Sequence, residues 1–174
     1  MKNIGILLTK NESDIIEEML SSCTRYFDLI VALDGSDDGT YEILARTPQV
    51  AFLARDTEIS PDGKIRDGAR GFLITYAQEH FGTGGWFTLL HGDEIFHTDP
   101  HSVTAMAERE GIDIVRWRMM NFFLHTSEAA QFDATDDPTK PIQERRRWYC
   151  PEWIEIRQFR NAPGVAFTPT AHAS

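Results

Sequence analysis

The chain has 174 residues, of which 41% are hydrophobic and 25% charged, so its composition excludes a disordered or fibrous protein. The formal net charge of −10 argues against bulk affinity for nucleic acid. Cys23 and Cys150 lie far apart without Cys-x-x-Cys spacing, which excludes zinc ribbons and disulfide scaffolds and favours a reducing compartment. Because no stretch approaches the roughly 20 apolar residues of a membrane span, we expect a cytoplasmic protein, at most peripheral to a membrane.

Apolar runs and helical periodicities alternate through the first 110 residues. Four mostly apolar runs are typical of strands buried on both faces: residues 4–8, 29–33, 50–54 and 86–90. Helices are expected between and after them: one with Asn11 as its N-cap, one over 41–46, one ending at Gly82 and one from the N-cap Asp99 to Gly111. This alternation predicts an α/β fold with a mainly parallel sheet and helices on both faces.

The pattern changes after Gly111. The alternation of Val115, Trp117 and Met119 with arginines predicts a strand with one solvent-exposed face. Residues 125–145 are polar and predict a long loop, and a late strand is expected around residues 154–157. We therefore expect one domain over 1–174, with a smaller irregular part over 111–174.

Polar residues follow three of the predicted strands: Asn11-Glu12, Asp34 to Asp38, and Asp93-Glu94. The carboxyl ends of parallel strands meet at one edge, where ligands of such sheets bind. Carboxylates gathered there repel one another unless they share a divalent cation or the donors of a ligand. Each cluster taken alone is also explained as a turn or a helix cap.

Several familiar motifs are excluded. The segment from Asp34 resembles the start of an EF-hand, but Ala45 stands where calcium needs a carboxylate. The loop after the first strand has no glycine, which excludes the Gly-x-Gly-x-x-Gly dinucleotide fingerprint, and a Walker phosphate loop is likewise absent from the sequence.

Three segments together resemble a known family. They are Leu8-Thr9-Lys10-Asn11-Glu12, then Asp34-Gly35-Ser36-Asp37-Asp38-Gly39-Thr40 after a buried strand, and then Leu89 to Phe96 with His91-Gly92-Asp93-Glu94. Their order and spacing resemble family-two glycosyltransferases with the A-type (nucleotide-diphospho-sugar transferase) fold, over roughly residues 3–99. The resemblance implies a donor-nucleotide-binding half over 1–110 and an acceptor-side part over 111–174.

The resemblance also implies site residues. The nucleotide sugar is expected near Thr9, Asn11, Glu12, Asp34, Arg70, His91 and Gly92. Asp93 matches the last acidic residue of the family's Asp-x-Asp motif and is expected to hold Mn²⁺ or Mg²⁺ at the diphosphate, whereas His91 replaces the first aspartate. Further candidate ligands are Glu94, which can equally be a helix-start carboxylate, and His172, which can equally lie on the surface. As a loop carboxylate, Asp34 is expected to contribute little to the core.

An inverting transfer needs a base for the acceptor hydroxyl. The Glu-Asp pair that the family often uses does not occur in this sequence. The available carboxylates in the corresponding stretch are Asp133, Asp136, Asp137 and Glu144, of which Glu144 is favoured because it adjoins an arginine cluster and Trp148. Five arginines fall between Arg145 and Arg160, where they suit phosphates or carboxylates or form a solvated, ion-paired face.

The sequence thus favours a metal-dependent, inverting glycosyltransferase that moves a sugar from a nucleotide-diphosphate donor to an unknown glycan, lipid or small-molecule acceptor. The alternative is a non-catalytic nucleotide or sugar-phosphate binding module on the same fold.

Overall fold

The computed structural model describes residues 1–55, 68–123, 140, 144 and 148–166. Six strands form one mixed sheet in the order β3-β2-β1-β4-β6-β5. The strands are β1 (Asn3–Thr9), β2 (Leu29–Asp34), β3 (Val50–Arg55), β4 (Trp86–His91), β5 (Ile114–Phe123) and β6 (Trp148–Arg160). The helices are α1 (Ile16–Cys23), the 3₁₀ turn η1 (Thr24–Tyr26), α2 (Thr40–Ala45), α4 (Gly68–Phe81) and α5 (Pro100–Arg109).

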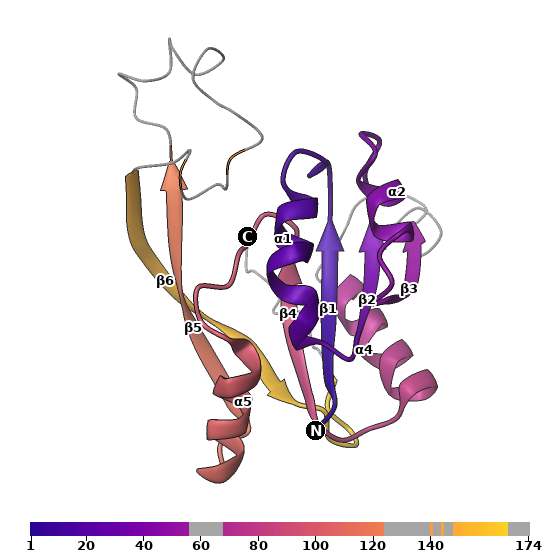
Figure 1. The fold of residues 1–174 in the computed structure, drawn as a ribbon. Helices are drawn as coiled ribbons and strands as arrows, with labels where there is room; N and C mark the ends of the chain where they lie inside the picture. Colours follow the sequence, from indigo (N-terminus) through magenta and orange to yellow (C-terminus); the bar gives the residue numbers. More distant parts are fainter. Residues whose placement is uncertain (56–67, 124–139, 141–143, 145–147, 167–174) are drawn as a thin grey trace, which may run out of the picture. The chain divides into compact units, whose positions relative to one another are not determined.

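The first four strands are parallel, as the alternation of strands and helices predicts. β1 pairs with β2 on one side and with β4 on the other, and β3 pairs with β2 (Figure 1). The chain therefore runs outward from β1 to β3 and then returns to the other side of β1 as β4. The point where this order reverses, between the carboxyl ends of β1 and β4, is the usual ligand-binding place of such sheets.

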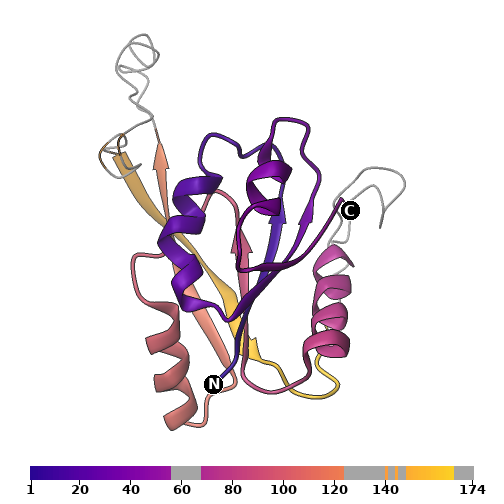
Figure 2. The same cartoon turned by 45° about the vertical axis from the view of Figure 1, so that its right-hand side comes forward.

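Two hydrophobic cores cover the two faces of these strands. On one face, α1 and α2 pack through Ile16, Met19 and Leu44 against side chains that include Leu7 and Leu90. On the other face, α4 packs Leu73, Ile74 and Ala77 against Ile4, Ile6, Val31 and Phe87 (Figures 1 and 2). Each fully buried Leu or Ile contributes about 1.5–3 kcal/mol, so the two cores fix the sheet that positions the loops.

The start of α1 differs from the sequence prediction. The helix begins at Ile16 with Ile15 at its N-cap, and Asn11 does not cap it. Asn11 adopts a φ of 57°, in the left-handed region, and its side chain bonds to a neighbouring loop. The prediction for α5 is confirmed, because the Asp99 side chain accepts a hydrogen bond from the His101 amide at 2.8 Å and Pro100 follows at the first turn.

The C-terminal part also differs from expectation. Both strands that the sequence predicts in this smaller irregular part are present, and they are longer than expected, since β5 has 10 residues and β6 has 13. Within β5 the expected alternation is present, since Val115, Trp117 and Met119 are half-buried and the arginines between them are exposed. Most of the expected loop over 125–145 lies outside the described residues.

The chain divides into two compact units. The first comprises Met1–Val115 and Arg157–Ser174, and the second comprises Arg116–Ile156. The first unit holds the parallel strands and the last residues of β6, which pair antiparallel with β4 from Trp86 to Thr88. Among the described residues, no helix has both the length and the apolar character needed to span a membrane.

Candidate functional site

The loops that follow β1 and β2 are joined to each other. Four hydrogen bonds, which we call the loop clasp, connect them: Asn11 N to Ser36 Oγ (2.8 Å), Asp37 N to Asn11 Oδ1 (3.0 Å), Glu12 N to Thr40 Oγ1 (2.9 Å) and Ser13 N to Asp38 Oδ2 (3.0 Å). The Thr40 hydroxyl and the amides that donate to Asp38 hold the pKa of its carboxyl well below its usual range. The backbone N–H and the Oδ1 of Asn11 thus bond to the neighbouring loop.

Asp34 ends β2 as a fully buried carboxylate. Its exposed fraction is 0%, and it accepts hydrogen bonds from Thr9 Oγ1 (2.7 Å), Ser36 Oγ (2.5 Å) and Ser36 N (3.1 Å). Arg55 lies 3.6 Å from it. The expectation that Asp34 contributes little to the core is therefore wrong, because the end of β2 buries a carboxylate that several groups of the fold satisfy. The predicted contact of Thr9 and Asp34 with a nucleotide stays a prediction.

Glu12 extends from the β1 loop over Gly92, beyond the end of β4. A Cβ on Gly92 would overlap the Glu12 carboxyl and would lie 3.0 Å from Thr9 Cγ2, so the absence of a side chain at position 92 makes room for Glu12. Oε2 of Glu12 is buried and has no hydrogen-bond partner among the described residues. Burial, together with the charges of Asp93 and Asp34, raises the pKa of Glu12 to about 8.

His91 is the last residue of β4, and two arginines lie near its imidazole. Arg70 Nη2, on α4, lies 2.5 Å from His91 Nε2. Burial, Arg157 on β6 and Arg70 together lower the pKa of His91 to about 3, so the ring is neutral. A guanidinium only donates hydrogen bonds, so Nε2 is the acceptor and the ring proton is on Nδ1.

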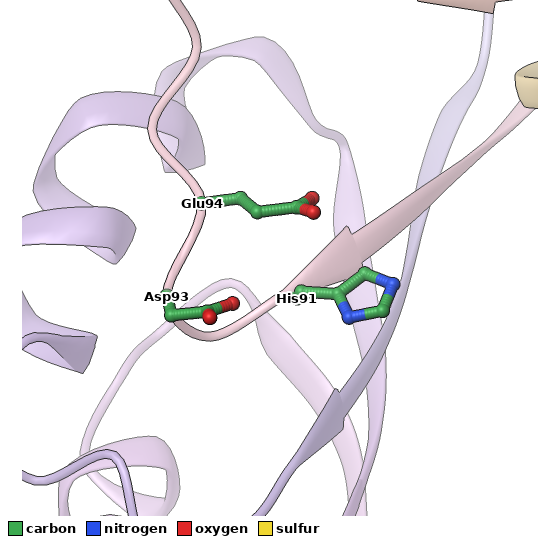
Figure 3. A group of neighbouring side chains, drawn as sticks. All are labelled: His91, Asp93 and Glu94. Carbon is green, nitrogen blue, oxygen red and sulfur yellow. The ribbon is translucent and has the colours of Figure 1, made fainter. Parts of the chain in front are cut away.

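The turn after β4 places His91, Asp93 and Glu94 together. One side-chain donor atom of each lies within 4.8 Å of the other two. Both carboxylates turn toward the side on which the His91 ring lies (Figure 3). Asp93 is exposed, whereas Glu94 is half-buried and its Oε1 lies 2.6 Å from Arg157 Nη2.

The donor set of this group suits a hard divalent cation through its carboxylates. Mg²⁺ and Mn²⁺ prefer oxygen ligands, and Asp93 and Glu94 supply them side by side. His91 suits a cation less well, because its Nε2 faces Arg70 and two positive charges act on the ring. The residues that would hold Mn²⁺ or Mg²⁺ are therefore Asp93 and Glu94.

The structure brings most of the predicted nucleotide and metal residues to one sheet edge: Thr9, Asn11, Glu12, Asp34, His91, Gly92, Asp93 and Glu94 lie at the ends of β1, β2 and β4, and Arg70 reaches His91 from α4. Of the three remaining candidates, Asp137 and His172 lie outside the described residues, and Glu144 is an exposed residue of the second unit.

Arg157 is the site residue that sequence reasoning did not single out. It follows Ile154 and Ile156, which are 55% and 42% exposed, and it is itself only 4% exposed. In this strand the buried face carries an arginine and the exposed face carries isoleucines, which is the opposite of the usual distribution. That pattern could have identified Arg157 as a candidate site residue.

Comparison with models of known protein families and with curated proteins finds no match.

Proposed function

We propose that the chain is a glycosyltransferase domain of the A-type fold. In this proposal it binds a nucleotide-diphosphate sugar beyond the carboxyl ends of β1, β2 and β4. It transfers the sugar, with inversion and with the help of Mn²⁺ or Mg²⁺, to a glycan, lipid or small-molecule acceptor. The order of the parallel strands and the three sequence segments that resemble family-two glycosyltransferases support this fold and activity.

The observation that carries the proposal is the arrangement of opposite charges around His91. Asp93 and Glu94 lie on the turn after β4. Arg70, on α4, lies 2.5 Å from His91 Nε2, while Arg157, on β6, pairs with Glu94 and its charge acts on the same histidine. A metal-bound diphosphate combines a cation with anionic phosphate groups. The two carboxylates suit the cation, and the two arginines suit the phosphates.

The same arrangement suits the chemistry of sugar transfer. Negative charge develops on the diphosphate as it leaves the sugar, and preorganised guanidinium groups stabilise that charge. A divalent cation held by Asp93 and Glu94 supplies further positive charge there when it is bound. The neutral imidazole of His91 orients Arg70, because its Nε2 accepts a hydrogen bond from the guanidinium. Glu144 and Asp137 remain the proposed candidates for the base.

One observation favours a second function, that of a nucleotide or sugar-phosphate binding module without catalysis. His91 contributes no negative charge, and it lies in the field of two arginines. With two arginines near His91 and no negative charge on it, this edge of the sheet can bind an anionic phosphate group without a metal ion. The two functions differ in metal dependence and in turnover, and one set of experiments separates them.

The test begins with a thermal-shift panel of nucleoside diphosphates and nucleotide sugars, with and without Mn²⁺. A ligand at about 100 times its Kd adds roughly 2.7 kcal/mol to the free energy of unfolding, which is a rise in Tm of about 5–10 °C. Release of the nucleoside diphosphate from the best donor, measured with and without candidate acceptors, then tests transfer. Binding without release supports the binding module. No shift with any nucleotide refutes the glycosyltransferase and the nucleotide-binding form of the module.

Asp93→Asn provides the sharper measurement. It removes the charge and nearly keeps the shape, so calorimetry should show that Mn²⁺ no longer strengthens nucleotide binding, while metal-free binding changes little. Asp113→Asn is the matched control, because Asp113 is an exposed carboxylate that lies 3.4 Å from Arg160. Undiminished metal dependence in Asp93→Asn would contradict the metal assignment.

A further inference from the structure

Arg157 is a buried cation with an identified counter-ion. Its side chain is 5% exposed, and its Nη2 lies 2.6 Å from Oε1 of Glu94, whose side chain is 29% exposed. Removing a guanidinium from water is costly unless an anion stays beside it. Glu94 supplies that anion in this structure, and it is the member of the pair that reaches solvent.

The surroundings of Arg157 add a second positive group. Arg157 and Arg70 both act on the ring of His91, and Arg70 lies within hydrogen-bond distance of it. Nε2 of His91 accepts a hydrogen bond from the Arg70 guanidinium and so orients it. Two guanidinium groups from different elements therefore contact the turn after β4, Arg70 at His91 and Arg157 at Glu94.

We infer that Arg157 is a phosphate-binding residue of this edge and that Glu94 is a counter-ion that an incoming phosphate group displaces. A phosphate oxygen replaces the carboxylate beside Arg157, so the buried guanidinium keeps an anionic partner throughout the exchange. Arg70 is close enough to the same imidazole to take part in holding a diphosphate. The assignment of this phosphate to a nucleotide sugar rests on the proposed function.

The exchange has a consequence for the cation. Oε1 of Glu94 pairs with Arg157 before the phosphate arrives, and the exchange lets that oxygen turn from the guanidinium to a cation. Binding of a diphosphate and binding of a divalent cation therefore strengthen each other, and by linkage each raises the affinity for the other by the same factor.

The test uses inorganic pyrophosphate and Mn²⁺ as probes, with titration calorimetry on the full chain. Without Mn²⁺, Glu94→Gln should bind pyrophosphate about tenfold more tightly than the wild type, because the competing charge is gone. With Mn²⁺, the gain in pyrophosphate affinity should be smaller in Glu94→Gln than in the wild type. Arg157→Lys keeps the positive charge but loses the two parallel N–H donors of the guanidinium, so it should bind pyrophosphate about tenfold more weakly.

Glu108→Gln is the matched control. Glu108 makes an ion pair of the same length, 2.6 Å, with Arg160, which lies on β6 as Arg157 does. The substitution Glu108→Gln also removes one negative charge, so it reproduces any general effect of net charge on pyrophosphate binding. If Glu94→Gln binds pyrophosphate no more tightly than Glu108→Gln, or more weakly than the wild type, the inference is overturned.

Two features keep the test decisive. Glu94→Gln leaves Arg157 in place, so the sign of its effect is readable even where an Arg157 variant fails to fold, which thermal melting detects. Nucleotide sugars are titrated in parallel. Tighter pyrophosphate binding in Glu94→Gln without any nucleotide-sugar binding refutes the proposed function and leaves the inference standing. Nucleotide-sugar transfer without tighter pyrophosphate binding in Glu94→Gln overturns the inference and leaves the proposed function standing.

Discussion

Asp34→Ala tests the finding that a predicted binding residue is part of the fold. The substitution removes the acceptor of three hydrogen bonds, from Thr9 and Ser36, inside a region where the exposed fraction of Asp34 is 0%. Hydrogen bonds to a charged group contribute about 1.5–3 kcal/mol each, and the loss of the desolvation cost of the carboxylate offsets part of the sum. The pair with Arg55 adds little, because Arg55 is 36% exposed and 3.6 Å away.

The expected loss is therefore about 3–5 kcal/mol in the free energy of unfolding. For a chain of this length, each kcal/mol corresponds to about 2–4 °C, so the Tm should fall by about 6–20 °C. Urea denaturation gives the free energy, and calorimetry gives the Tm.

Asp37→Ala is the control for this measurement, because Asp37 is an exposed carboxylate of the same loop. It should change the free energy of unfolding by less than about 0.5 kcal/mol. An Asp34→Ala variant that is as stable as Asp37→Ala would refute the reasoning, and would show that the groups around Asp34 find other partners.

Glu12 and Gly92 give two further predictions. Folded Glu12 holds its proton up to its pKa of about 8, whereas the unfolded chain releases it near 4.5. The contribution of Glu12 to stability therefore falls as pH rises between these values. His91, whose pKa is lowered from 6.5 to about 3, contributes the opposite slope below about pH 6.5, so the comparison is made between about pH 6.5 and 8. In that window Glu12→Gln should flatten the profile of Tm against pH, whereas exposed Glu79→Gln should leave it unchanged; parallel profiles for all three proteins would contradict the assignment. Gly92→Ala should lower the free energy of unfolding by roughly 1–3 kcal/mol, since its Cβ displaces the Glu12 carboxyl, and adding Glu12→Ala should restore part of this loss. Gly68→Ala is the control, because no atom of the described residues lies within 4 Å of its added Cβ, and an equal loss there would count against the contact.

The parallel strands could be predicted from the sequence because their burial is nearly complete. Residues such as Ile4, Ile6 and Val31 are fully buried, and a strand buried on both faces shows as a continuous apolar run. The meeting of three polar loops at one edge then followed from the parallel arrangement alone. Both inferences depend on patterns only a few residues long.

The features that escaped prediction depend on contacts distant in sequence. Asn11 has the residue type of a helix cap, but its side chain bonds to Asp37, 26 residues later, and the helix begins without it. Arg157 reaches the site because neighbouring Gln158 pairs with Thr88 in the sheet, a register that the local pattern of β6 does not determine. Local propensity carried no information about either partner.

The loop clasp gives the site a rigid framework before any ligand arrives. Its four hydrogen bonds join the segments after β1 and β2 to each other, so the backbone that carries Glu12 is ordered by folding. The conformational entropy of these loops is then lost once, when the chain folds, and binding does not have to order them again. A ligand of modest size can therefore use most of its contact energy for affinity, and the same rigidity restricts which ligands fit.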